Sequence, residues 1–277
     1  MRTALIGYTG FVGGNLQRQF AFDKCYRSVD IELLAAEQFD LVVCCGARAE
    51  KWKANADPAS DKANINRLQA ALRTASIGEL ILISTVDVYR HPVGVDETTP
   101  VETDGLGAYG LHRFQLEQFC RDHFQTRVFR LPGLFGSGLK KNAIYDLLHG
   151  NQVEKIHSLA QYQFYDLERL WSDIDLARRA DLSLVNLATP PLSMQDVARS
   201  AFGLTFRIQP DGVKPAQYDM RTVHASVFGA SQPLGIGMAA AAHDSAQGGL
   251  ESQYICTRQD LLSRLSDFVS RQRRLTA

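Results

Sequence analysis

A glycine-rich turn near the N-terminus constrains the fold more than any other feature of the sequence. The turn, Gly7–Gly13, follows an apolar strand at Ala4–Ile6 and leads into a helical stretch. We expect Gly7 to allow a tight turn, Gly10 to admit a ligand close to the backbone, and Gly13 to let the helix pack on the strand. A helix N-terminus also offers unpaired N–H groups to phosphates. This context predicts a Rossmann-type pocket for NAD or NADP. The predicted contacts in the turn are Gly7, Thr9, Gly10, Phe11, Val12 and Gly13.

Strand-like and helix-like segments alternate after the turn. Three apolar runs, each typical of a strand buried on both faces, are Leu41–Cys45, Leu80–Ser84 and Arg127–Leu131. Apolar residues at helical spacing occupy Asn64–Thr74 and Arg113–His123. This alternation predicts an α/β fold with a doubly wound parallel sheet and right-handed crossovers.

Two interleaved regions are expected. Residues 1–135 form the predicted NAD(P)-binding Rossmann domain, and residues 136–277 form a smaller, less regular substrate-side region. A buried strand at about 182–188 is expected to return to the main sheet. The segment Ser231–Ser252, rich in Gly, Ala, Ser and Gln, predicts a loop or insertion, and an amphipathic helix is expected at Arg258–Arg271.

Composition excludes several classes of protein. The 277 residues are 45% hydrophobic and 22% charged, which is typical of a soluble globular chain with a sizeable core. Lys+Arg and Asp+Glu both number 30, so we expect no nucleic-acid surface. No segment resembles a signal peptide or reaches the roughly 18 apolar residues of a membrane span, which predicts a cytoplasmic protein. The five cysteines lack metal-ligand spacing, so neither a disulfide framework nor a metal site is expected.

The end of the second strand is where NAD and NADP sites differ. An acid there suits the ribose hydroxyls of NAD, whereas an arginine suits the additional phosphate of NADP. Arg27 and Ser28 favour NADP, while Asp30 leaves NAD open. We therefore predict NADP or NAD, with NADP slightly favoured. The small residues Gly46 and Ala47 are expected to let the adenosine side of the cofactor approach the third strand.

A polar cluster is predicted at the carboxyl ends of the strands. The strand Leu80–Ser84 continues into Thr85 and then Asp87, and strand ends of open α/β sheets face their ligands. Further on, a helix through Tyr109 and Arg113 places both side chains on one face, because they are four residues apart. A neighbouring positive charge lowers the pKa of a tyrosine and so favours proton exchange near neutral pH.

These motifs, taken in order, resemble the extended short-chain dehydrogenase/reductase family. Members of that family are NAD(P)-dependent nucleotide-sugar epimerases, dehydratases and ketoreductases. The resemblance covers the first half of the chain. It is carried by the glycine turn, Ser84–Tyr89, Tyr109–Glu117 and Arg130–Gly136, the last being similar to the family's strand-end Arg-Pro…Tyr-Gly element.

The resemblance implies roles for individual residues. It makes Tyr109 the catalytic acid/base and Thr85 the hydroxyl that holds the same substrate oxygen. The family has a lysine four residues after the tyrosine, and Arg113 stands there instead, with a permanent charge on a planar fork. Tyr109 and Arg113 are also expected to contact the cofactor. The residues placed beside the nicotinamide are Pro132, Gly133 and Leu134.

The resemblance also bears on substrate and reaction. Family dehydratases carry an Asp-Glu pair directly after the threonine, but this chain has Val86 and Asp87, which disfavours dehydration. Asp87 remains available to a substrate hydroxyl. Further substrate contacts, to a nucleotide-sugar, are expected from Lys140, Asn142 and Arg221.

Together these features predict an NAD(P)-dependent oxidoreductase or epimerase acting on a nucleotide-linked or otherwise activated sugar. Two alternatives stay open. One is a non-catalytic NAD(P)-binding sensor or scaffold protein, because Arg113 replaces the lysine. The other is a reductase of a non-sugar carbonyl compound, because a fold does not determine the substrate. A homodimer through the helices at 64–74 and 113–123 is a further expectation, and neither nucleic acid nor a membrane is an expected partner.

Overall fold

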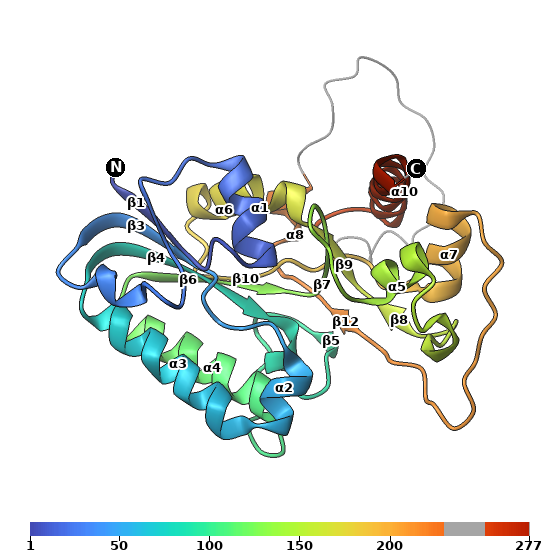
Figure 1. Cartoon of the computed structure of the whole chain (residues 1–277), viewed down its shortest axis with the longest axis horizontal. Coiled ribbons are helices and arrows are strands. Elements are labelled where there is room, and N and C mark those ends of the chain that lie inside the picture. The colour runs from blue at the N-terminus through green and yellow to red at the C-terminus, as the bar shows by residue number, and fades with distance from the viewer. Residues whose placement is uncertain (230–252, 277) are drawn as a thin grey trace, which may run out of the picture.

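A six-stranded parallel sheet forms the centre of the larger lobe in the computed structural model, which describes residues 1–229 and 253–276 (Figure 1). The strand order is β10-β6-β4-β3-β1-β2. The strands are β1 (Thr3–Ile6), β2 (Lys24–Tyr26), β3 (Gln38–Cys44), β4 (Ser76–Thr85), β6 (Thr126–Leu131) and β10 (Leu184–Asn186). The chain runs outward in opposite directions from β1 and β3, so the switch point at which such sheets bind ligands lies between them. The predicted doubly wound parallel sheet is confirmed.

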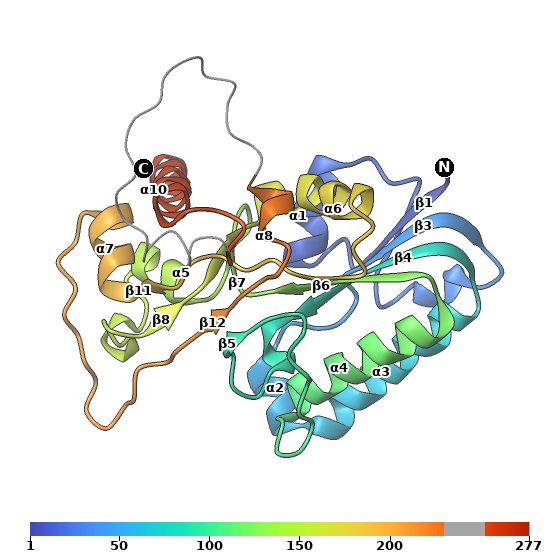
Figure 2. The ribbon, with the colours of Figure 1, turned by 180° about the vertical axis from the view of Figure 1, so that it is seen from behind.

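Helices cover both faces of this sheet, as Figures 1 and 2 show. On one face lie α3 (Pro58–Arg73) and α4 (Ala108–His123), and on the other lie α1 (Phe11–Gln19) and α6 (Leu170–Arg179). Successive strand residues point to opposite faces, so Val42 packs in the core under α3 and α4 while its neighbours pack in the other. Because the six strands are parallel, their carboxyl ends lie at one edge of the sheet, between the two helical layers.

The smaller lobe lies beside the carboxyl ends of the strands (Figure 1). Its core brings together side chains from α5 (Ala143–His149), α7 (Met194–Phe202) and α10 (Arg258–Thr276). Short strand pairs join the segments of this lobe to one another and to the larger lobe. They are β7 (Gly133–Phe135) with β9 (Phe164–Asp166), β8 (Gln161–Tyr162) with β11 (Leu192–Ser193), and β5 (Val93–Val95) with β12 (Asp219–Met220).

Two helices begin earlier in the structure than the sequence predicts, and the N-cap residues explain where they start. The first helix begins at Phe11 rather than after Gly13, because Gly10 occupies its N-cap. The helix expected at 64–74 begins at Pro58, where the Asp57 side chain accepts a hydrogen bond from the Ser60 N–H and proline suits the first helical turn. Within the range 182–188, where a returning strand was expected, the structure has β10, which pairs with β6. The predicted loop at 231–252 lies outside the described residues, and the division at residue 135 stays a prediction.

The helices predicted to pair two subunits use their apolar residues inside the chain. Ile65 and Leu68 of α3 and Leu116 and Phe119 of α4 are buried in one core with the sheet. The amphipathic pattern is therefore explained by packing on the sheet, and dimerisation stays a prediction. Within residues 1–229 and 253–276, no helix is long and apolar enough to cross a membrane.

A buried ion pair fastens α4 to the sheet. Arg130 at the end of β6 donates from Nε to Glu117 Oε1 at 3.0 Å and from Nη2 to Oε2 at 2.6 Å. Ser84 of β4 donates to the same carboxylate at 2.5 Å, and Arg130 Nη1 donates to the Tyr89 hydroxyl at 2.7 Å. The side chains of Arg130 and Glu117 are 2% and 0% exposed. The pair thus sets the position of α4 against β4 and β6.

We predict that Glu117→Gln lowers the free energy of unfolding by about 3–5 kcal/mol, because it leaves the Arg130 charge buried without its counter-ion. Urea denaturation at neutral pH measures the loss. Asp122→Asn, at an exposed position of the same helix, is the control and should change stability by less than about 0.5 kcal/mol. Equal stability of the two variants would contradict the importance of the buried pair.

Candidate functional site

The glycine turn packs so closely against the end of β3 that side chains would not fit there. Gly7 has a φ of +87°, and a Cβ on it would lie 2.5 Å from the Cys45 carbonyl oxygen. A Cβ on Gly13 would lie 2.2 Å from the Gly7 carbonyl oxygen. The Gly7 N–H also donates to the Tyr26 carbonyl at 2.7 Å, which brings the end of β2 beside the turn. Side chains at Gly7 or Gly13 would therefore push the turn off the switch point.

The N-terminus of α1 is open to an anion. Gly10 occupies the N-cap, no side chain caps the helix, and its first turn holds no acidic residue. Thr9 and Gly10 are exposed. The first-turn N–H groups and the positive end of the helix dipole are thus free of competing carboxylates, which is the arrangement that a pyrophosphate needs. The residues present fit the dinucleotide predicted for this turn.

A cavity beside the turn brings together residues that lie far apart in the sequence. Seven of the predicted site residues line it, and they are Val12, Ala47, Thr85, Tyr109, Arg113, Pro132 and Leu134. Sequence analysis missed five others, which are Cys45, Ala49, Ile83, Ser84 and Leu131. Most of those five are apolar residues at strand ends, and periodicity alone does not distinguish them from core.

Gly46 and Gly133 do not line this cavity, and each is explained by a close approach. A Cβ on Gly133 would lie 2.7 Å from the Gln163 carbonyl oxygen, so this glycine lets β7 pair closely with β9. A Cβ on Gly46 would lie 3.1 Å from the Ile6 side chain. Both help to shape the edge on which the cavity opens.

Arg27 and Ser28 follow β2 on the exposed side of the turn. The Arg27 side chain is 52% exposed and its Nε lies 3.3 Å from Asp30 Oδ2, while the Arg27 backbone N–H donates to Asp30 Oδ1 at 2.6 Å. The two residues that favoured different cofactors are thus held together at one position. An exposed ion pair of this kind is weak enough to exchange for a phosphate.

Tyr109 lies in the first turn of α4, which contacts α2 and the segment after β4. Its N–H donates to Asn55 Oδ1 of α2 (Lys51–Ala56) at 3.0 Å. The Arg113 Cζ atom lies 4.0 Å from the Tyr109 ring centroid. Gly110 lets the helix approach closely, since a Cβ there would lie 2.0 Å from the Asp87 carbonyl oxygen. The predicted proximity of Tyr109 and Arg113 on one helix face is what the structure shows.

The charge of Arg113 is neutralised by a residue that sequence analysis missed. Arg113 Nη1 donates to Asp61 Oδ2 at 2.5 Å, and Nη2 donates to the Arg48 carbonyl. His112 Nδ1 lies 2.7 Å from the same Asp61 oxygen. Burial alone raises the pKa of Asp61, but the hydrogen bonds from Arg113 and His112 outweigh it and hold that pKa below its ordinary value. Asp61 lies on α3, far from any recognisable motif, so only the fold reveals its part.

The expected lowering of the Tyr109 pKa is wrong. Burial is the largest influence and raises this pKa, and the negative charge of Asp87 raises it further. The charge of Arg113 and a hydrogen bond with Thr85 lower it, but by less. Tyr109 is therefore a protonated phenol at neutral pH, suited to donating a proton.

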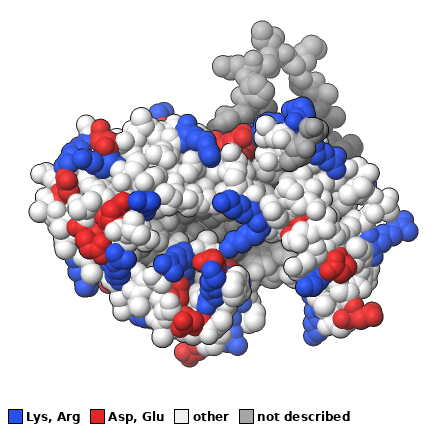
Figure 3. Space-filling model, in the orientation of Figure 1, with Lys and Arg blue, Asp and Glu red and all other residues white. Residues whose placement is uncertain are grey.

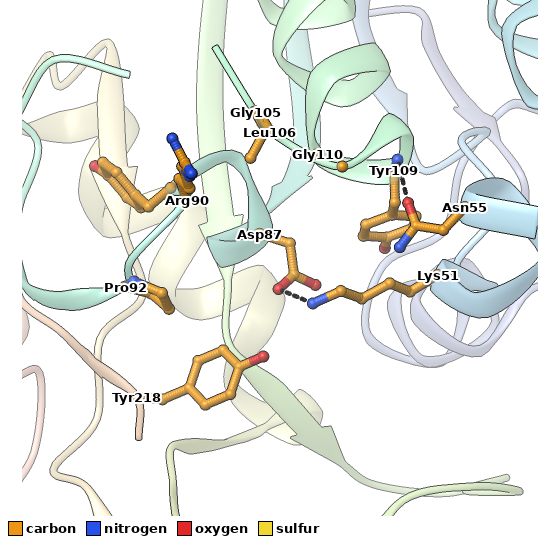
Figure 4. A pocket seen from close by; sticks show the side chains of 12 residues that line it. Lys51, Asn55, Asp87, Arg90, Pro92, Gly105, Leu106, Tyr109, Gly110 and Tyr218 are labelled. Carbon is orange, nitrogen blue, oxygen red and sulfur yellow. Dashed lines mark hydrogen bonds and ion pairs between the residues drawn. The ribbon is translucent and has the colours of Figure 1, made fainter. Parts of the chain in front are cut away.

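A second cavity opens on the other side of Tyr109 (Figure 4). Asp87 points into it and accepts a hydrogen bond from Lys51 Nζ of α2 at 2.7 Å, with Tyr218 of the smaller lobe beside the pair. Other lining residues include Asn55 and Arg90. Figure 3 shows this face of the molecule hollowed between the lobes, with charged side chains along the hollow. Asp87 was predicted here, whereas Lys51, Asn55 and Tyr218 carry no sequence motif.

The predicted substrate contacts beyond Gly136 occupy varied positions. Asn142 caps α5: its Oδ1 accepts from the Ile144 N–H at 3.0 Å and its Nδ2 donates to the Leu134 carbonyl at 2.8 Å, so it supports the cavity wall. Lys140 is exposed. Arg221 lines neither of the two cavities, and its Nη2 pairs with Asp219 Oδ2 at 2.7 Å. The structure thus brings Asp87 to Tyr109 but does not bring Arg221 there.

Cysteine and metal chemistry find no support at this site. Burial raises the pKa of Cys44 to about 11 and that of Cys45 well above its ordinary value, so both are neutral thiols. Cys44 is fully buried, as expected of a small apolar residue. In the part of the chain that the structure describes, no three His, Cys, Asp or Glu side chains are grouped to hold a metal ion.

We predict that Asp61→Asn lowers the free energy of unfolding by about 3 kcal/mol at pH 7, because the buried Arg113 loses its counter-ion. A carboxyl whose folded pKa is depressed stabilises the protein above its ordinary pKa of 3.8, and this contribution is lost as the pH falls through the folded value. Denaturation at several pH values should show a constant difference between native protein and variant from pH 5 to 7, narrowing below about pH 4. A difference independent of pH would contradict the role of the Asp61 charge.

The chain resembles known proteins in its structure but not in its sequence. No family model and no curated protein sequence matches it. Among solved structures, RMD from Pseudomonas aeruginosa, complexed with NADPH, is 18% identical with a TM-score of 0.67, over 98% of this chain and 100% of that one. UDP-glucose 4-epimerase from Thermotoga maritima, with UDP-glucose, is 13% identical with a TM-score of 0.65, over 100% of both chains. A dTDP-4-dehydrorhamnose reductase from Clostridium acetobutylicum is 15% identical with a TM-score of 0.61, over 82% of this chain and 91% of that one.

The chain shares the fold of these structures, so the fold that the resemblance implied is confirmed. The similarity extends past the first half of the chain, to which the motifs were confined. The chain has the fold of these proteins: a Rossmann-type parallel sheet with an interleaved C-terminal region.

Proposed function

We propose that this protein belongs to the extended short-chain dehydrogenase/reductase family and is an NAD(P)-dependent oxidoreductase or epimerase acting on a nucleotide-linked or activated sugar. The observation that carries the proposal is the position of Tyr109, which lines both the cavity beside the glycine turn and the polar cavity that holds Lys51 and Asp87. A phenol between a cofactor cavity and a polar cavity is placed to exchange a proton with a substrate oxygen. Solved structures of the same fold contain NADPH or UDP-glucose, which supports both halves of the assignment.

The cofactor would lie along the switch-point edge. The open N-terminus of α1 would hold its pyrophosphate, Arg27 would meet the adenosine ribose or its phosphate, and Pro132 with Leu134 would contact the nicotinamide. When bound, the nicotinamide supplies or accepts the hydride. Residues 1–135 would bind the cofactor, and residues 136–277 would cover the substrate.

The state of Tyr109 favours the reductive direction. Since burial and Asp87 keep the phenol protonated, it can donate its proton to a carbonyl oxygen that Thr85 holds. Dehydration needs a further carboxylate that acts as acid or base. Among the described residues that line the polar cavity, the carboxylate is Asp87, and it is paired with Lys51. We therefore favour reduction of a keto-sugar, or an epimerisation that passes through one.

We predict that Arg27→Ala weakens binding of NADPH about tenfold, because it removes a charge-assisted contact to the ribose phosphate. Binding of NADH, which lacks that phosphate, should change less than about twofold. Isothermal titration calorimetry with both cofactors makes the comparison. Arg18→Ala, an exposed arginine at the other end of α1, is the control. Equal losses for NADPH and NADH would remove Arg27 from phosphate recognition.

We predict that Tyr109→Phe lowers kcat by about 10²–10⁴-fold, because it removes the proton donor, while NAD(P)H still binds. The assay follows NAD(P)H oxidation with a panel of nucleotide-linked keto-sugars and simple carbonyl compounds. Tyr145→Phe, on α5 and outside both cavities, is the control. Native protein that binds NAD(P)H but turns over nothing in the panel would favour the non-catalytic alternative.

A further inference from the structure

The arginine beside Tyr109 cannot supply protons. A guanidinium keeps its proton at any pH near neutrality. In this structure the Arg113 side chain is also 4% exposed and committed to Asp61 and to the Arg48 carbonyl. The proposed function, on which this inference rests, requires the Tyr109 phenol to lose and regain a proton in each cycle. Arg113 therefore does not return that proton, whereas the polar cavity that Tyr109 also lines holds a lysine that can.

Among the described residues that line this polar cavity, Lys51 is the titratable cation. The pKa of Tyr109 is affected by Asp87, which follows β4 and raises it, and by Lys51, at the start of α2, which lowers it. Lys51 Nζ lies 2.7 Å from Asp87 Oδ1, and Tyr218 lies beside the pair and helps to raise the pKa of Lys51. Figure 4 shows the Tyr109 hydroxyl and the Lys51–Asp87 pair facing the same space.

The Lys51 ammonium contacts both the cavity and the solvent. Its side chain is 51% exposed, whereas that of Asp87 is 19% exposed. Burial alone lowers the pKa of Lys51, but the charge and hydrogen bond of Asp87 outweigh it and raise that pKa. Lys51 therefore carries its proton at neutral pH, and bulk water can replace the proton once it is given up.

We propose that Lys51, from a different helix, serves Tyr109 as its exchangeable cation: the ammonium stabilises the phenolate and returns a proton to it. When Tyr109 protonates the substrate oxygen, the phenol O–H bond breaks and a substrate O–H bond forms. An N–H bond of Lys51 then breaks as the phenol O–H bond reforms, directly or through water. The Lys51 amine takes its replacement proton from solvent, and Asp87 and Tyr218 position it throughout.

Titration of a single labelled phenol tests the electrostatic half of this proposal. A fluorinated tyrosine, which ionises at lower pH than tyrosine, is placed at position 109 of the full chain, and its ¹⁹F signal is followed against pH without cofactor or substrate. Lys51→Met should raise the pKa of this phenol by about one unit, since an attractive charge is lost. Lys51→Arg should restore the native midpoint, and Asp87→Asn should lower it.

Lys53→Met is the matched control for the titration. Lys53 lies on the same helix, but its ammonium is 2.6 Å from Glu50 Oε1. Its loss should leave the midpoint unchanged. Equal midpoints for the Lys51→Met and Lys53→Met variants would overturn the coupling of Lys51 to Tyr109. Far-ultraviolet circular dichroism checks the fold, which an exposed position on α2 should not disturb.

Turnover tests the proton-transfer half. Lys51→Arg keeps the charge but cannot release a proton, so kcat for the keto-sugar that the native protein reduces should fall at least about tenfold with little change in KM. Native kcat in this variant would overturn proton delivery by Lys51. Failure of the proposed function has a different signature: the native protein turns over nothing, while the labelled phenol still shifts in the Lys51→Met variant.

Discussion

The buried pair between Arg130 and Glu117 is the interaction on which the geometry of the site depends. It joins the middle of α4 to the ends of β4 and β6, and these strands lead into Thr85 and Pro132. Moving the helix away from Arg130 would leave a buried charge without its partner, so the pair stabilises this position of α4 on the sheet. The pair is also hydrogen-bonded to Ser84 and Tyr89, which line the two cavities, so it ties the position of the helix to the walls of both.

Two further contacts fix the N-terminal turn of α4. Gly110 allows the helix to touch the backbone of Asp87, and Asn55 accepts a hydrogen bond from the Tyr109 N–H. Behind the ring, Asp61 holds Arg113 and neutralises it. The Tyr109 phenol is therefore restrained by α2, by the segment after β4 and, through Arg113, by α3. Burial raises its pKa and keeps it protonated. Under the function proposed above, this combination suits a proton donor better than a base.

The fold and the grouping of Thr85, Tyr109 and Arg113 could be predicted from the sequence, because short, local sequence patterns indicate both. Strands buried on both faces appear as apolar runs, and the turn at Gly7 with the Thr85 and Tyr109 motifs follows a recognisable order. Helix starts were misplaced where caps such as Asp57 decided them. Asp61 and Lys51 escaped prediction because each acts on a residue dozens of positions away. An isolated charge on an amphipathic helix looks like any solvated residue until the fold supplies its partner.

The polar cavity is built from both lobes, because Tyr218 enters its wall from the smaller one. Tyr218 precedes β12, which pairs with β5 of the larger lobe, while the cavity beside the glycine turn is formed without it. Among the described residues, Tyr109 is the one that lines both cavities. Under the function proposed above, substitutions in the segment before β12 would change which substrate is bound and leave cofactor affinity unchanged. Substrate preference would then change within one connecting segment, while the residues around the glycine turn stay the same.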